Sequence, residues 1–152
     1  MKLSLKGEYA LRALVTLSLL PTSEVVRIQQ ISEHQNIPKR FLEQILNELR
    51  SGGFVESRRG IHGGYRLAKP AGEITLAEII RHIQGPLAPI PCVSERFYAK
   101  CSCPDESRCA LRSVMKEVRD AISGLLSKYT CADLAARAHS LESRTMLEDY
   151  CI

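Results

Sequence analysis

Four of the chain's six cysteines lie in one short stretch. Cys92, Cys101, Cys103 and Cys109 fall within 18 residues, separated by eight, one and five residues. Thiolates that converge from one loop bind zinc or an iron–sulfur cluster. Zinc sites usually carry paired C-x-x-C knuckles, which this stretch lacks. The spacing therefore favours an iron–sulfur cluster, two-iron or four-iron, and leaves zinc open.

The same cysteines could instead form a thiol–disulfide switch. Such a switch needs an activated thiolate, and Arg96, Lys100 and Arg108 are near enough along the chain to lower a thiol's pKa. The remaining cysteines suit neither role. We expect Cys131 to be a small buried residue at the start of a helix, and Cys151 to belong to a C-terminal tail.

Charge and hydropathy indicate a cytoplasmic protein with a polyanionic partner. Residues 1–70 hold 11 Lys and Arg against 6 Asp and Glu, whereas residues 71–152 hold 10 against 11. No apolar run reaches the roughly 18 residues of a membrane span. Charged residues interrupt the first 14 residues, which therefore do not resemble a signal peptide. We find no Ser-His-Asp arrangement, phosphate-binding loop or catalytic carboxylate pair, so we do not expect an enzyme.

A basic helix and hairpin supply side chains that suit DNA. On a helix over residues 38–50, a polar stripe lies opposite four aliphatic residues. Arginine reads guanine, glutamine or asparagine reads adenine, and glutamate accepts from cytosine in the major groove. We expect the DNA contacts of this helix to come from Lys39, Arg40, Glu43, Gln44 and Asn47.

The hairpin that follows has arginines beside a glycine-rich tip. Arg58 and Arg59 precede Gly60, Gly63 and Gly64, and glycines allow close approach to a sugar–phosphate wall. Arginine at such a tip can enter the narrow minor groove, and His62 could contact a phosphate. The alternative is an ordinary surface hairpin whose arginines have no DNA partner.

These residues sit in a recognisable order of elements. Helices are expected over about 4–20, 28–35 and 38–50, then strands over 54–58 and 65–67, and a helix over 75–83 opened by a Thr-Leu-Ala-Glu capping box. This order predicts a mainly α fold with a small β-hairpin, a winged helix-turn-helix. We divide the chain into a DNA-binding domain (1–84), a cysteine loop (85–108), a dimerisation helix with a capping helix (109–139) and a tail (140–152).

The helix over 109–129 predicts a homodimer. Its apolar residues step by four and three, as in a coiled-coil seam: Leu111, Met115, Val118, Ile122, Leu125 and Tyr129. A symmetric dimer would present two recognition helices about one helical turn of DNA apart, so the operator should be roughly palindromic. A shorter helix, capped by Thr130, is expected over 132–139.

Four stretches together resemble the IscR-like family of bacterial winged-helix regulators, which includes iron–sulfur, nitric-oxide and cysteine-metabolism sensors. They are MKLSLKGEYALRAL (1–14), IPKRFLEQIL (37–46), RGIHGGY (59–65) and ITLAEII (74–80), and the resemblance extends to about residue 135. It implies a homodimer joined through the long C-terminal helix and DNA contacts from Glu43, its neighbours and Arg59. It also implies Cys92, Cys103 and Cys109 as cluster ligands.

The fourth ligand departs from the family pattern. Where the iron–sulfur biogenesis regulator has a ligand histidine, this chain has Arg112. Related sensors use an acidic residue near the N-terminus, which implies Glu8, supplied by the partner subunit, as the first candidate. The additional Cys101 is the second.

We therefore expect a transcription regulator that senses iron–sulfur, redox or nitric-oxide status through a cysteine-ligated cluster. One alternative is a clusterless or zinc-binding member that responds through thiols or a protein partner. A different class of function, a winged-helix protein–protein adaptor, also uses this scaffold.

Overall fold

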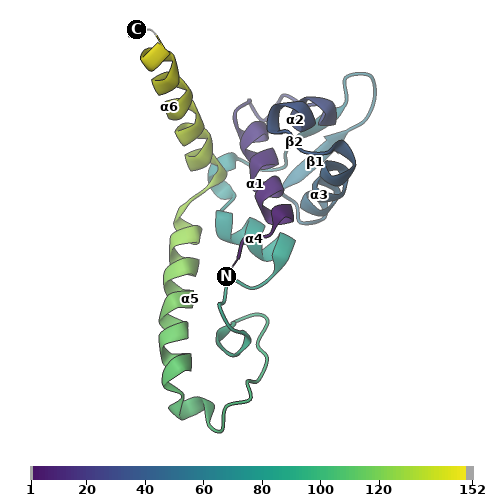
Figure 1. Cartoon of the computed structure of the whole chain (residues 1–152). Coiled ribbons are helices and arrows are strands. Elements are labelled where there is room, and N and C mark those ends of the chain that lie inside the picture. The colour runs from purple at the N-terminus through teal and green to yellow at the C-terminus, as the bar shows by residue number, and fades with distance from the viewer. Residues whose placement is uncertain (1, 150–152) are drawn as a thin grey trace.

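The computed structural model describes residues 2–149, with side chains described up to residue 143. The helices and strands run in the order α1 (Leu5–Ser18), α2 (Ile28–Gln35), α3 (Lys39–Ser51), β1 (Val55–Arg58), β2 (Gly64–Leu67), α4 (Leu76–Gln84), α5 (Ala110–Lys128) and α6 (Cys131–Asp149). Helices α1–α4 and the hairpin gather into one body, while α5 extends away from it with the cysteine loop alongside (Figure 1). This confirms the predicted winged helix. No helix in the described range is long and apolar enough to cross a membrane.

Aliphatic side chains from α1, α3 and α4 form the core. The predicted apolar face of α3 is confirmed, because Leu42, Ile45, Leu46 and Leu49 are all 0% exposed. Burial of each such side chain contributes about 2 kcal/mol of transfer free energy. Since one face of α3 is committed to this core, its opposite polar face must point to solvent.

Local capping sets the helix boundaries that the sequence indicated. The side chains of Thr75 and Glu78 each accept from the other's backbone N–H at the start of α4, which is the predicted capping box. Thr130 and Asp133 form a corresponding pair at the start of α6. Asn36 ends α2 in the left-handed conformation, with φ of 50°. Pro38 precedes α3 as its N-cap rather than occupying its first turn.

Two parts of the sequence-based description need correction. The last helix does not end near residue 139 but continues to Asp149, so most of the predicted tail is helical. The loop before α5 is also less irregular than expected, since it contains two short 3-10 turns, Pro91–Val93 and Glu106–Arg108. Cys131 is 0% exposed at the start of α6, as predicted. Cys151 lies outside the described residues.

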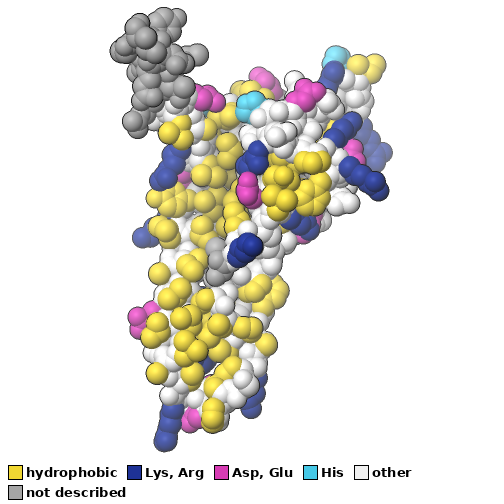
Figure 2. All heavy atoms as spheres, viewed as in Figure 1, with side chains coloured by type: hydrophobic (Ala, Val, Ile, Leu, Met, Phe, Trp, Pro, Cys, Tyr) yellow, Lys and Arg dark blue, Asp and Glu magenta, His cyan; other side chains and the backbone are white. Residues whose placement is uncertain are grey.

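Helix α5 contributes no buried residue to the chain. Apolar side chains of the predicted seam remain uncovered along it, with Leu111 61%, Val118 37% and Leu125 56% exposed. Figure 2 shows hydrophobic side chains along this extended part of the molecule. An apolar stripe of this length on a monomer surface is typical of a protein–protein interface, and the joining of two subunits through α5 stays a prediction.

Replacing Val118 with Asp should convert a dimer into monomers. The substitution places a charge in a seam that association would dehydrate, which is strongly unfavourable without a partner, while the folded monomer tolerates it at the exposed surface. Light scattering measures the mass directly. Ser113→Asp is the matched control, because it adds the same charge on the opposite side of α5. A Val118→Asp protein that stays dimeric would place the interface elsewhere.

Candidate functional site

Helix α3 presents the predicted polar stripe to solvent. Lys39 and the four stripe residues are all exposed: Arg40, Glu43, Gln44 and Asn47. Among the described residues, no ion pair ties any of them to the rest of the chain. A rigid helix with unengaged donors and acceptors on one face is the arrangement that reads base edges in a major groove.

The hairpin beside α3 depends on glycines at its tip. A Cβ on Gly63 would lie 2.4 Å from the carbonyl oxygen of Arg58, and a Cβ on Gly64 would lie 2.5 Å from that of Val26. Gly60 has φ of +106°, which favours glycine. The turn therefore closes only with glycines, and it leaves Arg58, Arg59 and His62 exposed.

Two residues that the sequence reasoning missed brace this hairpin. Val26 exchanges both backbone hydrogen bonds with Tyr65, at 2.8 Å each, and so forms an isolated β-bridge at the edge of the two-stranded sheet. The Nη2 of Arg27 donates to the carbonyl oxygen of Ile61 at the tip, at 3.2 Å. Because these contacts join positions 34 or more residues apart, no local pattern in the sequence could have indicated them.

The four clustered cysteines come together beside α5. Cys92 is 3% exposed, while Cys101, Cys103 and Cys109 are half-buried. Their thiols lie in a row, in which Cys101 interacts with both Cys92 and Cys103, and Cys103 also interacts with Cys109. Cys92 is thus buried within the loop, next to the equally buried Val93.

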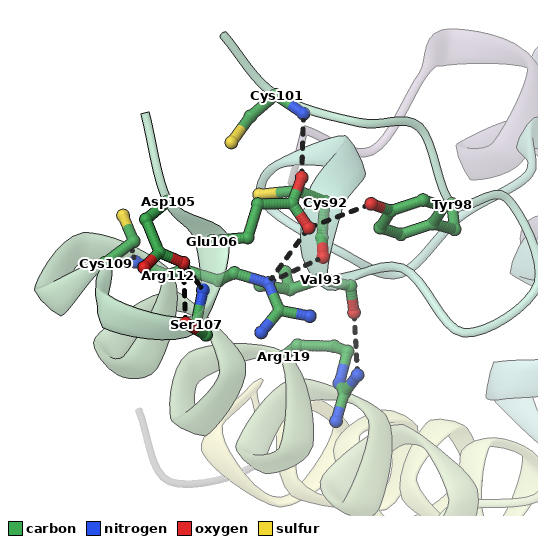
Figure 3. Close-up of polar contacts among 10 residues, drawn as sticks. All are labelled: Cys92, Val93, Tyr98, Cys101, Asp105, Glu106, Ser107, Cys109, Arg112 and Arg119. Carbon is green, nitrogen blue, oxygen red and sulfur yellow. Dashed lines mark hydrogen bonds and ion pairs between the residues drawn. The ribbon is translucent and has the colours of Figure 1, made fainter. Parts of the chain in front are cut away.

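Glu106 organises this loop, although the sequence reasoning did not identify it. Its carboxylate accepts from the backbone N–H of Cys101 at 3.0 Å and from the hydroxyl of Tyr98 at 2.8 Å, and it lies 4.0 Å from Arg112 (Figure 3). The bond from the Cys101 N–H is the main cause that lowers the pKa of Glu106. Donation to this carboxylate raises the pKa of Tyr98.

Two thiols of this row, Cys92 and Cys103, are not activated, because the pKa of each is raised. Burial raises the pKa of Cys92, and the hydrogen bond with Cys101 raises the pKa of Cys103 to about 12. Arg108, expected to lower a thiol pKa, is 89% exposed and lies 3.7 Å from Asp105 instead. For Cys92 and Cys103, the pKa shift is therefore opposite to the one a thiol switch predicts.

The cysteines fit a metal centre by donor type and proximity, but they are not yet arranged around a common point. Within the described residues, no three Cys, His, Asp or Glu side chains have a geometry that would hold a metal ion. Four soft thiols in contact within one loop nevertheless form the donor set that zinc and iron–sulfur clusters use. Rotation of the thiols toward one centre would be needed to bind either group.

The remaining candidate ligand, Glu8, lies on another element. Its side chain is 52% exposed on α1, where it pairs with Arg12 at 3.4 Å. The structure therefore brings Cys101 to the other cysteines but does not bring Glu8 to them within one chain. Arg112, which the resemblance aligned with a ligand histidine of the iron–sulfur biogenesis regulator, donates to the carbonyl oxygen of Cys92.

Comparison with known proteins gives consistent relatives. Residues 3–137 match the profile of the Rrf2 family, described as an iron-dependent transcriptional regulator. The chain is 38% identical over 148 residues to a putative HTH-type transcriptional regulator, rrf2-like, of Rhodobacter capsulatus, with 95% of this chain and 97% of the relative covered. It is 32% identical to the HTH-type transcriptional regulator IscR of Cronobacter sakazakii, with 93% and 85% covered.

Solved structures show the same architecture. The structure of CymR, the global cysteine regulator of Bacillus subtilis, superposes with a TM-score of 0.77 at 31% identity, covering 90% of this chain and 98% of that one. The IscR structure of T. potens superposes with a TM-score of 0.72 at 29% identity, covering 91% and 88%.

Removal of Glu43 should relax sequence preference more than it weakens DNA binding. Glutamate discriminates by accepting from cytosine and repelling other base edges, so Glu43→Ala should reduce the cost of a mismatch at the contacted base from about 1–3 kcal/mol toward zero. An operator selected from random duplexes with the wild-type protein allows the mismatch series to be measured. Glu33→Ala, on the exposed surface of α2, is the control. An unchanged mismatch cost in Glu43→Ala would remove α3 from the readout.

Removal of Arg59 should weaken binding to all duplex sequences. A minor-groove arginine acts mainly through the negative potential of the groove, so Arg59→Ala should lower the slope of log affinity against log salt by about 1. Lys116→Ala removes the same charge from α5, away from the hairpin, and should leave the slope unchanged. Equal slopes for Arg59→Ala and wild type would exclude the hairpin from the interface.

Proposed function

Because the chain belongs to the Rrf2 family of transcriptional regulators, we propose that it binds DNA as a homodimer and that the state of its cysteine loop controls this binding. The relatives are regulators rather than enzymes. The observation that carries the proposal is the row of four thiols, one of them buried, on the loop that leads into α5.

The DNA-binding part of the proposal rests on two neighbouring surfaces. The exposed stripe of α3 suits the major groove, and the arginines of the braced hairpin suit the adjacent minor groove. Two copies joined through α5 would read a roughly palindromic operator. Binding to DNA would require the protein to act in the cytoplasm, where a bacterial chromosome lies.

The sensing part rests on the donor set. An iron–sulfur cluster, when bound, supplies a redox-active centre whose potential depends on net charge and on hydrogen bonds to sulfur. In this chain Cys92 would be the buried anchor, and the half-buried Cys103 and Cys109 would complete the three ligands that the family pattern implies. Glu106 and Arg112 hold the loop backbone around them.

For the fourth position we propose Cys101, ahead of Glu8 of the partner subunit. Cys101 lies in the middle of the thiol row, in contact with Cys92 and Cys103. Glu8 is engaged with Arg12 on the same helix and could act only across a dimer interface. An all-cysteine set is also softer, which suits iron and sulfide better than an oxygen donor does.

A second function, a thiol switch, is supported by the contact between Cys92 and Cys101. Hydrogen peroxide could oxidise these two thiols, forming one S–S bond and two water molecules, with the peroxide accepting the two electrons and two protons. This alternative uses the same loop and would also change how it is held on α5. The two functions differ in whether iron and sulfide are taken up.

Loss of Cys101 should abolish cluster uptake, whereas loss of Glu8 should not. After anaerobic reconstitution with iron and sulfide, we expect Cys101→Ala to remain colourless, because one of four thiolates is missing. Glu8→Ala should retain wild-type visible absorbance and iron content. Cys131→Ala, which removes a buried cysteine outside the loop, is the control.

Three other results would change the proposal. A coloured Cys101→Ala and a colourless Glu8→Ala would assign the fourth position to the partner subunit's Glu8. If the wild-type protein takes up no iron or sulfide, two alternatives remain. They are a zinc site, which metal analysis would detect, and a switch based on the peroxide-sensitive thiol pair. Absence of salt-dependent binding to any duplex DNA would favour a protein–protein adaptor.

A further inference from the structure

Two arginines of α5 hold successive carbonyl groups of the cysteine loop. The Nε of Arg112 donates to the carbonyl oxygen of Cys92 at 3.2 Å, and the Nη1 of Arg119 donates to that of Val93 at 2.7 Å (Figure 3). The two arginines are seven residues apart, so they lie on one face of the helix. Residues 92 and 93 are therefore attached to α5 at two points, two helical turns apart.

These contacts occur where water competes weakly. The side chain of Arg119 is 13% exposed, and its guanidinium also bonds Asp120 and lies 3.7 Å from Glu95. Arg112 is 35% exposed and pairs with Glu106. Hydrogen bonds from charged donors stabilise more than neutral ones, so this pair of bonds is a substantial part of what keeps Cys92 buried.

A third contact links a thiol itself to the helix. The Sγ of Cys109 accepts from the backbone N–H of Arg112 at 3.4 Å and so caps α5. Arg112 thus contacts Cys109 through its backbone and Cys92 through its side chain. The first and last cysteines of the row meet at this single residue.

The attachment points lie next to the apolar seam. Leu111 and Val118 precede Arg112 and Arg119 by one residue each, which places the two faces about 100° apart around α5. A displacement of the loop that pulls on both arginines would therefore turn or shift the same two helical turns that carry the seam. In these turns no residue of α5 is fully buried, whereas Leu126, further along the helix, packs against the core.

We propose that Arg112 and Arg119 are positioning residues that transmit the state of the cysteines to α5. They fix Cys92 on the helix, so that metal binding or oxidation at the thiols changes the position of the apolar seam of α5. In a dimer, this shift would change the spacing of the two recognition helices. This inference rests on the proposed function, because it assumes that DNA binding depends on the loop.

The test compares Arg112→Gln/Arg119→Gln with wild type in two measurements. The first is the alkylation rate of each cysteine by iodoacetamide in the metal-free protein. Loss of both arginine–carbonyl bonds should speed alkylation of Cys92 by about tenfold or more. The buried Cys131 in the same molecule should stay unmodified, which would show that the fold is intact. Arg112→Lys/Arg119→Lys retains donors and should restore part of the protection.

The second measurement is the ratio of operator affinities before and after anaerobic loading with iron and sulfide. We expect this ratio to collapse toward 1 in the double Gln variant, with no change in Arg108→Gln, which removes an exposed charge from the same loop without touching a carbonyl. The proposal would be overturned if Cys92 of the double Gln variant were alkylated as slowly as Cys131. It would also be overturned if that variant kept the wild-type ratio of operator affinities. If the wild-type protein itself has an affinity ratio of 1, the proposed function is refuted instead. The alkylation rates would still show whether the two arginines hold Cys92 on α5.

Discussion

Helix α5 spans 19 residues, and none of them is fully buried within its own chain. This constraint determines how the helix is held on the rest of the molecule. Its position depends on polar attachments: Arg112 and Arg119 to the cysteine loop, and Arg81 of α4, whose Nη2 donates to Ser123 at 2.6 Å. At its far end, the backbone of Tyr129 accepts from Leu76. Leu126, near the end of α5, packs against the core. The turns that carry Arg112 and Arg119 have no fully buried residue and are held mainly by polar contacts, so they can respond more readily to a change in the cysteine loop.

The DNA-binding body is built on the opposite principle. Its recognition helix and hairpin are set by an aliphatic core and by backbone pairing of Val26 with Tyr65, so their mutual geometry is rigid. Rigidity here suits recognition, since base-edge contacts need fixed donors and acceptors. Regulation by the loop would then act on the spacing between two rigid bodies in a dimer rather than on the internal geometry of either one.

In the cysteine loop, a few partly exposed polar contacts hold the chain in place of a core. Glu106 gathers a backbone N–H, a tyrosine hydroxyl and an arginine, and these partners lower the pKa of its carboxyl group. One thiol of the row is buried and the others are half-buried, which combines a fixed anchor with access for a reagent or a metal. Because the contacts of Glu106 hold the loop, it can stay ordered while its thiols remain free to react with a reagent or to bind a metal.

Periodicity and capping in the sequence determined the elements. The aliphatic face of α3, the Thr75–Glu78 box and the glycine tip are local patterns, and each appears in the structure as predicted. The apolar spacing of α5 is also a local pattern, and its role as a dimer seam stays a prediction. The same holds for the clustering of cysteines, because they are close along the chain. The final helix was underestimated because its sequence after residue 139 has no strong apolar period.

Only the tertiary structure decided which long-range partners meet. It placed Cys101 rather than Glu8 beside the other cysteines within one chain, buried Cys92, and brought Val26 and Arg27 to the hairpin. It also showed Arg112 and Arg119 holding two successive carbonyls. These contacts join backbone groups and side chains distant in sequence, and a backbone carbonyl carries no residue identity, so composition and spacing could not reveal which arginine would bind it.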